Sequence, residues 1–176
     1  MWDVTGLGSL PEFAHRASDR LAWLVDRVCI ALMVLLVLDV WLGVLVRYMW
    51  PLPITFMEEA ARYLMIWVAL LAVSSCIARR EHIGVQAVFG ALPLGARRVL
   101  LLVLDLMGIA FFALLFFYGI GLVDRGGRTF TMIYGLSKAV PFAAVPVAAA
   151  IAAVQLALVA VRDQARIRVH PEHVFP

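Results

Sequence analysis

Charged side chains are scarce in this sequence. They make up 15% of its 176 residues, whereas 64% of the residues are apolar. Soluble domains carry about 25% charged and about 45–50% apolar residues, so the composition excludes an ordinary soluble enzyme. Nearly uncharged runs of about 18 or more residues are typical of membrane-spanning helices. The sequence therefore predicts an integral membrane protein with no separate soluble catalytic domain.

Cysteine and histidine are rare where redox or metal chemistry would need them. The two cysteines, Cys29 and Cys76, lie in apolar stretches and are interpreted as small hydrophobic residues. Membrane cytochromes bind haem through histidines inside their spans, whereas all four histidines here lie outside the expected spans. They are His15, His82, His170 and His173. We expect no metal, no cofactor and no enzymatic activity. Nucleic-acid binding is not expected, because the basic residues flank apolar runs instead of forming one stripe.

Four stretches are apolar and long enough to cross a bilayer, and they predict an all-α fold. They cover about residues 24–46, 56–78, 99–123 and 139–161. Pro51 and Pro53 interrupt the chain after the first stretch, and Thr55 and Glu58 have capping-box spacing, so the second helix should begin near Phe56. The expected fold class is an all-α integral membrane protein with four transmembrane helices plus short amphipathic interfacial helices.

The remaining segments predict three regions along the chain. Residues 1–22 form a cytoplasmic leader whose short helix lies on the membrane surface, 23–162 form the four-helix membrane domain, and 163–176 form a polar tail. Within 79–98, the residues Val85, Val88, Phe89 and Leu92 recur at helical spacing between flanking arginines. This pattern favours a short amphipathic helix in the plane of the membrane interface.

The basic residues predict the orientation of the chain. Ten lie in the leader, the 79–98 connection and the tail, whereas four lie in the other two connections. The first group is Arg16, Arg20, Arg27, Arg79, Arg80, Arg97, Arg98, Arg162, Arg166 and Arg168, and the second is Arg47, Arg125, Arg128 and Lys138. Because cytoplasmic connections of inner-membrane proteins are enriched in Lys and Arg, we expect both termini in the cytoplasm.

Two carboxylates inside the expected spans, Asp39 and Asp105, are candidate functional residues. Asp39 and Arg62 lie at matching depths in antiparallel spans, which predicts an ion pair, although Glu58 and Glu59 compete for Arg62 within its own helix. Asp105 lies near the inner face, where Arg27 or Arg79 could reach it. A role in a proton or ion path stays open for both aspartates.

Several short motifs occur in an order that helix physics alone does not explain. Arg47-Tyr48 closes the first span, Glu59-Ala60-Ala61-Arg62-Tyr63 opens the second, and Arg79-Arg80-Glu81-His82-Ile83 follows it. Together with four spans and cytoplasmic termini, this arrangement resembles the small membrane subunit (DctQ-like) of tripartite ATP-independent periplasmic (TRAP) transporters. The candidate partner-interface or charge-network residues are Asp39, Arg47, Tyr48, Glu58, Glu59, Arg62, His82 and Asp105.

The resemblance implies a non-catalytic accessory subunit in the bacterial inner membrane. Its expected partners are a large multi-span permease subunit, which holds the substrate and sodium sites, a periplasmic protein that delivers an organic acid or related solute, and membrane lipids. An autonomous proton-coupled exporter that uses Asp39 or Asp105 is the alternative. A membrane-embedded enzyme would need a cluster of catalytic groups at one depth, and the sequence offers only isolated acids.

Overall fold

The structure, a computed structural model, describes residues 9–49, 56–79, 94–130, 135 and 137–169. These residues form the helices α1 (Ser9–Met49), α2 (Phe56–Arg79), α4 (Leu94–Gly127) and α5 (Ala139–Val169). Each contains a stretch that is long and apolar enough to cross a membrane. The predicted all-α fold with four potential transmembrane helices is therefore confirmed. The amphipathic helix expected within 79–98 falls largely outside the described residues.

Helix α1 is longer than the expected first span and also includes the expected leader helix. Its 41 residues correspond to about 61 Å at about 1.5 Å per residue, roughly twice the thickness of a bilayer core. Between Pro11 in its first turn and Gly43 near its end, the sequence contains no proline or glycine. Because nothing interrupts the backbone hydrogen bonds there, the leader helix is not a separate element and continues directly into the first span.

Two of the other helices, α2 and α5, begin at the predicted residues. α2 begins at Phe56 and α5 at Ala139, the first residues of the second and fourth expected spans. The hydroxyl of Ser137 accepts a hydrogen bond from the Ala139 backbone N–H at 3.2 Å and so caps the start of α5. α4 extends beyond the expected third span at both ends and includes the expected turn as far as Gly127.

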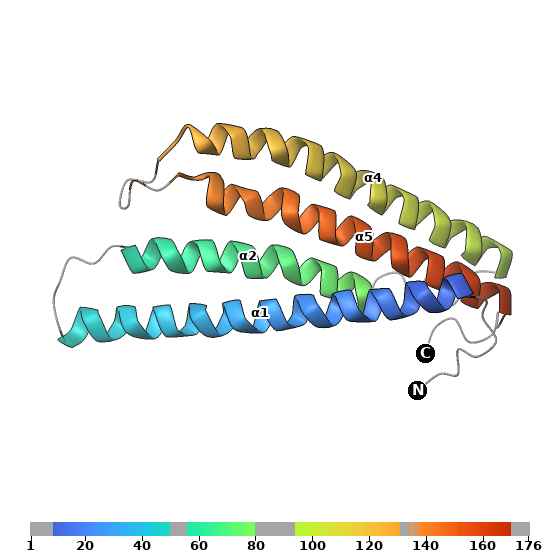
Figure 1. Ribbon diagram of the computed structural model, residues 1–176, viewed down its shortest axis with the longest axis horizontal. Coiled ribbons are helices and arrows are strands. Elements are labelled where there is room, and N and C mark those ends of the chain that lie inside the picture. Colours follow the sequence, from blue (N-terminus) through green and yellow to red (C-terminus); the bar gives the residue numbers. More distant parts are fainter. Residues whose placement is uncertain (1–8, 50–55, 80–93, 131–134, 136, 170–176) are drawn as a thin grey trace.

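The four helices form an elongated antiparallel bundle in which α5 is central (Figure 1). α1 and α2 form one hairpin, α4 and α5 form the other, and α5 contacts α1, α2 and α4. Val25, Leu71 and Ala148 form one core cluster, which joins α1, α2 and α5. Ile77, Ala152 and Leu156 form a second cluster between α2 and α5. At one end of the bundle, α1, α4 and α5 extend past the last turn of α2 (Figure 1).

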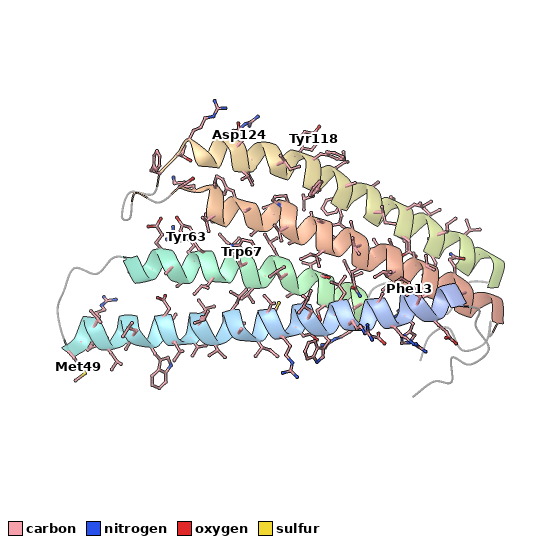
Figure 2. All side chains as sticks on the ribbon, in the orientation of Figure 1. Phe13, Met49, Tyr63, Trp67, Tyr118 and Asp124 are labelled. Atoms are coloured by element: carbon pink, nitrogen blue, oxygen red, sulfur yellow. The ribbon has the colours of Figure 1, made fainter. Side chains whose placement is uncertain are left out.

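Large apolar side chains cover the outside of the bundle. In Figure 2, Tyr118 points outward from α4, and its exposed fraction is 78%. Trp41 on α1 and Phe117 on α4 are 69% and 70% exposed. An apolar exterior of this kind would be unfavourable in water and is suited to lipid or to another membrane protein.

Candidate functional site

A polar cluster joins α1 to α2 near the end of α2. Asp26 on α1 forms an ion pair with Arg79, whose Nη2 lies 2.8 Å from Asp26 Oδ2. The hydroxyl of Ser75 donates a hydrogen bond to the other carboxylate oxygen, Oδ1. Ser75 and Arg79 lie one helical turn apart and therefore share a face of α2. Three side chains thus fix the register of the antiparallel pair, and we call this group the inner clamp.

The inner clamp changes two sequence-based interpretations. Arg27 and Arg79 were the two candidate partners of Asp105, and the structure places the Arg79 guanidinium on Asp26. Asp26 itself was not among the predicted site residues, although it lies within the first expected span. Its position one residue after the buried Val25 was the available signal, since it places the carboxylate beside the α1–α2 contact.

A second group of polar residues lies toward the other end of the same hairpin. The phenol of Tyr63 donates a hydrogen bond to Glu59 Oε1, one turn earlier in α2. Glu59 Oε2 and Asp39 Oδ2 are buried and have no hydrogen-bond partner among the described residues. Asp39 lies 13 residues after Asp26, and Arg62 lies 13 residues before Ser75. The register of the inner clamp therefore places Asp39 at the level of Arg62.

The expected ion pair between Asp39 and Arg62 is nevertheless absent. In the described part of the chain, Arg62 forms no ion pair with Asp39, Glu58 or Glu59, and its side chain is exposed. Successive helical residues point about 100° apart. Tyr63, next to Arg62, is the residue that reaches Glu59. Matching depth in the bundle was therefore not sufficient, because the direction of each side chain around its helix axis decides which groups meet.

The other candidate residues do not gather at this group. Tyr48 is 81% exposed at the end of α1, and Arg47 and Glu58 are exposed as well. Asp105 belongs to α4, is 4% exposed and has an interaction partner. His82 lies outside the described residues. The candidate residues are thus dispersed over the bundle and do not form a single site.

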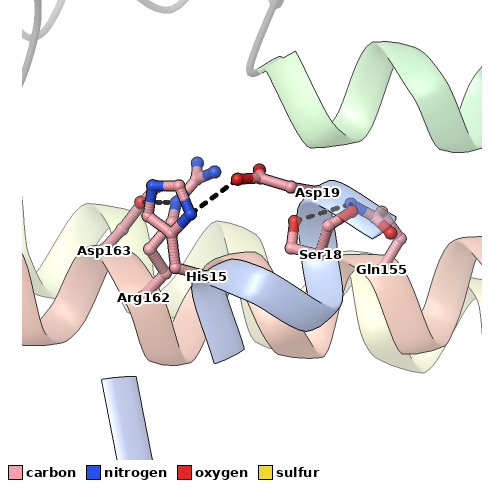
Figure 3. A network of polar contacts seen from close by, with 6 residues as sticks. All are labelled: His15, Ser18, Asp19, Gln155, Arg162 and Asp163. Carbon is pink, nitrogen blue, oxygen red and sulfur yellow. Dashed lines mark hydrogen bonds and ion pairs between the residues drawn. The ribbon is translucent and has the colours of Figure 1, made fainter. Parts of the chain in front are cut away.

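A third polar group, also missed from the sequence, lies where α1 extends along the last turns of α5 (Figure 3). Gln155 and Ser18 are completely buried, and Gln155 Nε2 donates hydrogen bonds to Ser18 Oγ at 2.8 Å and to its carbonyl oxygen at 3.2 Å. His15 contacts Asp19, and Arg162 contacts Asp163, beside them. A lone amide in an Ala-rich apolar helix was the signal that could have indicated a contact between helices.

These contacts serve helix packing more directly than chemistry. The inner clamp joins α1 to α2, and the Ser18–Gln155 pair joins α1 to α5. No group of three or more potential metal ligands occurs among the described residues. The polar side chains inside the bundle thus hold its helices in register.

Comparison with known proteins identifies the family. The sequence matches the DctQ component of tripartite ATP-independent periplasmic transporters over residues 36–166. The chain belongs to the DctQ family. The resemblance inferred from Arg47-Tyr48 and the motif around Arg62 is thereby confirmed. The DctQ match includes α2 entirely, but Ser18 and Asp26 precede it.

A relative in Haemophilus influenzae supports the same assignment. It is named as a TRAP transporter small permease protein and is 30% identical to this chain over 99 residues. The alignment covers 56% of this chain and 57% of the relative, so little more than half of either sequence is compared. DctQ membership and four apolar helices indicate a multi-pass protein of the inner membrane that is a component of a transporter.

Proposed function

We propose that this DctQ-family chain is a non-catalytic small permease subunit of a sodium-coupled TRAP transporter. It acts as a scaffold for a large multi-span permease subunit. That permease takes up an organic acid or related solute, which a periplasmic binding protein delivers. The family match and the name of the H. influenzae relative support this assignment. In this proposal both termini face the cytoplasm, because the basic residues are concentrated on that side.

The observation that carries the scaffold role is the division between the inside and the outside of the bundle. Inside, the inner clamp joins α1 to α2, and the amide nitrogen of Gln155 joins α5 to Ser18 of α1. Among the described residues, Gln155 Oε1 is buried without a hydrogen-bond partner. Outside, α1 and α4 expose large apolar side chains along their lengths. Membrane helices associate mainly through close side-chain packing, so these faces suit the helices of a larger subunit.

The interior of the bundle favours a scaffold role over a role in transporting the solute. α5 continues from Ala139 to Val169 as one helix despite Pro146, and it packs against three other helices. Ala144, Ala149 and Ala152 of α5 are at most 1% exposed. Solute sites in many secondary transporters are built from interrupted helices near the membrane midplane. The described helices are continuous, and the central one buries one face, although Val147 and Val154 on its other face are 41% and 54% exposed.

One observation favours the autonomous exporter as a second candidate. Asp39 Oδ2 is buried without a hydrogen-bond partner in the described part of the chain, and a carboxylate inside a membrane span is by default a candidate for proton coupling. Asp39 would then change its protonation state during transport. The exporter therefore requires that Asp39 can gain and lose a proton, whereas the scaffold role does not require this.

Reconstitution in liposomes separates the two candidates. The purified chain is inserted alone, and in parallel together with the large permease, with the binding protein supplied outside and a sodium gradient applied. We expect substrate uptake only from the complete system. Solute flux or proton-coupled export from the small chain alone would overturn the scaffold role.

Two asparagine variants sharpen this test. In the complete system, Asp39→Asn and Asp105→Asn should leave the sodium dependence of uptake unchanged, whatever their effect on the amount of assembled complex. Gly121→Ala serves as a matched control, because the added methyl group points into open space on α4. A change of ion dependence in Asp39→Asn with normal assembly would instead support a coupling role for this carboxylate.

A further inference from the structure

Arg27 and Trp23 form a contact on the outer side of α1. The Arg27 guanidinium carbon lies 4.9 Å from the centroid of the Trp23 ring, which is the geometry of a cation–π interaction. Trp23 is 58% exposed, and Arg27 is exposed too. A guanidinium stacked on a ring keeps its edge N–H groups available, and these match the oxygens of a phosphate. The pair thus presents a fixed phosphate-binding group on the surface.

This pair belongs to a longer stripe along α1. Arg16, Arg20, Trp23 and Arg27 follow one another at intervals of three or four residues and therefore share a face. The buried residues Ala14, Ser18 and Val25 of the same helix lie about opposite that face. Arg16 lies 3.7 Å from Glu12, whereas Arg20 and Arg27 form no ion pair with any described residue.

The same stripe continues as a purely apolar surface. Its next members are Ile30, Val34, Val37 and Trp41, which are 59%, 53%, 49% and 69% exposed. Arg27 and Arg47 lie about 30 Å apart along the helix, which equals the thickness of a bilayer core. Arg27 therefore reaches the headgroup level of one leaflet when Arg47 reaches that of the other. The apolar stripe then lies at the depth of the acyl chains.

We propose that this face of α1 is a binding site for an anionic phospholipid of the cytoplasmic leaflet. Arg20 and Arg27 bind the headgroup phosphate, Trp23 lies at the interface, and one acyl chain runs along Ile30, Val34 and Val37. The charge of the stripe is complementary to anionic lipid, because Arg20 and Arg27 flank Trp23 at the headgroup end and only apolar residues follow from Ile30 to Val37 at the depth of the acyl chains. The assignment to the cytoplasmic leaflet rests on the topology of the proposed function.

Fluorescence of Trp23 tests the site directly. Trp2, Trp41, Trp50 and Trp67 are replaced by phenylalanine, so that Trp23 is the single tryptophan. The full chain is placed in phosphatidylcholine vesicles with a minor fraction of brominated phosphatidylglycerol or of brominated phosphatidylcholine, whose bromines quench neighbouring tryptophans. We expect stronger quenching by phosphatidylglycerol, and a lower preference at high salt, because salt screens the ion pairs.

Substitutions then assign the preference to the two arginines. Each basic residue near a charged membrane surface contributes about fivefold in binding, so Arg20→Gln with Arg27→Gln should lower the preference by up to about 30-fold, to the level of the bulk mixture. Arg27→Lys retains the charge and should retain most of the preference. The matched control is Arg125→Gln with Arg128→Gln at the opposite end, which should change nothing at Trp23. Circular dichroism establishes that each variant keeps its helix content.

The possible results distinguish failure of the lipid site from failure of the scaffold role. Equal quenching by both brominated lipids in the parent, or an unchanged preference in a folded Arg20→Gln, Arg27→Gln variant, overturns the lipid site. Binding of the large permease is measured separately by co-purification. If the permease binds but the lipid preference is absent, only the lipid site fails. If the lipid preference is present but no permease binds, the scaffold role fails and the lipid site stands.

Discussion

The two hairpins of this protein are held together by different interactions. α1 and α2 are joined by the inner clamp, in which Asp26 binds Ser75 and Arg79. α4 and α5 are joined by close approach at glycines, because an added Cβ would lie 2.5 Å from Leu156 at Gly108 and 2.5 Å from Phe142 at Gly126. Polar contacts specify register through a few atoms, whereas glycine contacts specify it through shape along the helix.

This difference separates two ways of stabilising helices in lipid. The hydrophobic effect does little between helices there, so either hydrogen-bonded side chains or tight packing must replace it. The α1–α2 pair, here called the polar hairpin, has its specific contact at one end. The α4–α5 pair, here called the glycine hairpin, has its close contacts distributed along α4. Gln155 then connects the hairpins through its hydrogen bonds to Ser18. Substitutions at the inner clamp, at the glycines of α4 and at Gln155 measure how much each contact contributes to the free energy of unfolding.

The largest effect is expected where the two hairpins meet. Gln155→Ala removes a completely buried side chain and its hydrogen bonds to Ser18, leaving a cavity and an unsatisfied hydroxyl. We expect a loss of about 2–4 kcal/mol in the free energy of unfolding, measured in detergent micelles by circular dichroism. Val154→Ala, at a neighbouring position that is 54% exposed, is the control and should have a small effect. Equal losses in both variants would mean that the Ser18–Gln155 contact does not hold the hairpins together.

The glycine hairpin is tested at two adjacent residues. A methyl group at Gly126 would lie 2.5 Å from the Phe142 ring and 3.1 Å from the Lys138 carbonyl oxygen, whereas one at Gly127 would meet nothing within 4 Å. Overpacking of this kind costs about 1–3 kcal/mol, so Gly126→Ala should lower the free energy of unfolding by that amount. Gly127→Ala should leave it unchanged or slightly higher. If both variants behave alike, close packing at Gly126 is not what joins α4 to α5.

The polar hairpin should respond less strongly, because water and headgroups partly reach its clamp. The side chains of Asp26 and Arg79 are 33% and 56% exposed. Asp26→Asn keeps an acceptor for Ser75 but removes the charge that pairs with Arg79, and we expect a loss of about 1 kcal/mol. Asp124→Asn breaks the more exposed pair with Arg128 at the end of α4 and should have no measurable effect. A larger loss in Asp124→Asn would reverse the assigned importance of the two pairs.

The positions of the helices could be predicted from the sequence more accurately than the contacts between the helices could. The start of α2 was predicted from local signals, Pro51 and Pro53 followed by Thr55 and Glu58, and the start of α5 was predicted from the beginning of its apolar stretch. The leader helix and the first span were expected as two elements, whereas the chain forms one helix from Ser9, because no proline or glycine separates them. α1 extends to Ser9 through packing of Ser18 against α5, a contact between residues far apart in the sequence.

The candidate site shows the same limit. Depth could be estimated by counting residues, and the register of the inner clamp does set Asp39 level with Arg62. Rotation about each helix axis could not be counted in that way, because it depends on how α2 packs on α1 and α5 together. Asp26 and Gln155 are each one polar residue within an apolar stretch, and only the bundle shows which partner each one meets.

The smallest effect is expected at Asp39 and Arg62, which lie toward the end of the polar hairpin that is opposite the inner clamp. Asp39 Oδ2 is buried, and no described residue forms a hydrogen bond with it that would offset the cost of removing this oxygen from water. Asp39→Asn removes the charge at nearly constant volume, so the free energy of unfolding should stay the same or rise by up to about 1 kcal/mol. The measurement is the same detergent unfolding used for Asp26→Asn. Because Arg62 is exposed and forms no ion pair with described residues, Arg62→Ala should change stability by less than about 0.5 kcal/mol.

Comparing Asp39→Asn with Asp26→Asn shows whether the α1–α2 hairpin is held at one level or at two. If Asp39→Asn destabilises the chain more than Asp26→Asn does, the Asp39 carboxylate must hold a positive group, and the α1–α2 hairpin would then be clamped at two levels. If Asp39→Asn is neutral and uptake by the reconstituted transporter is unchanged, the hairpin is held at one level only. The second result would leave Asp39 without a structural or coupling requirement, as the scaffold role predicts.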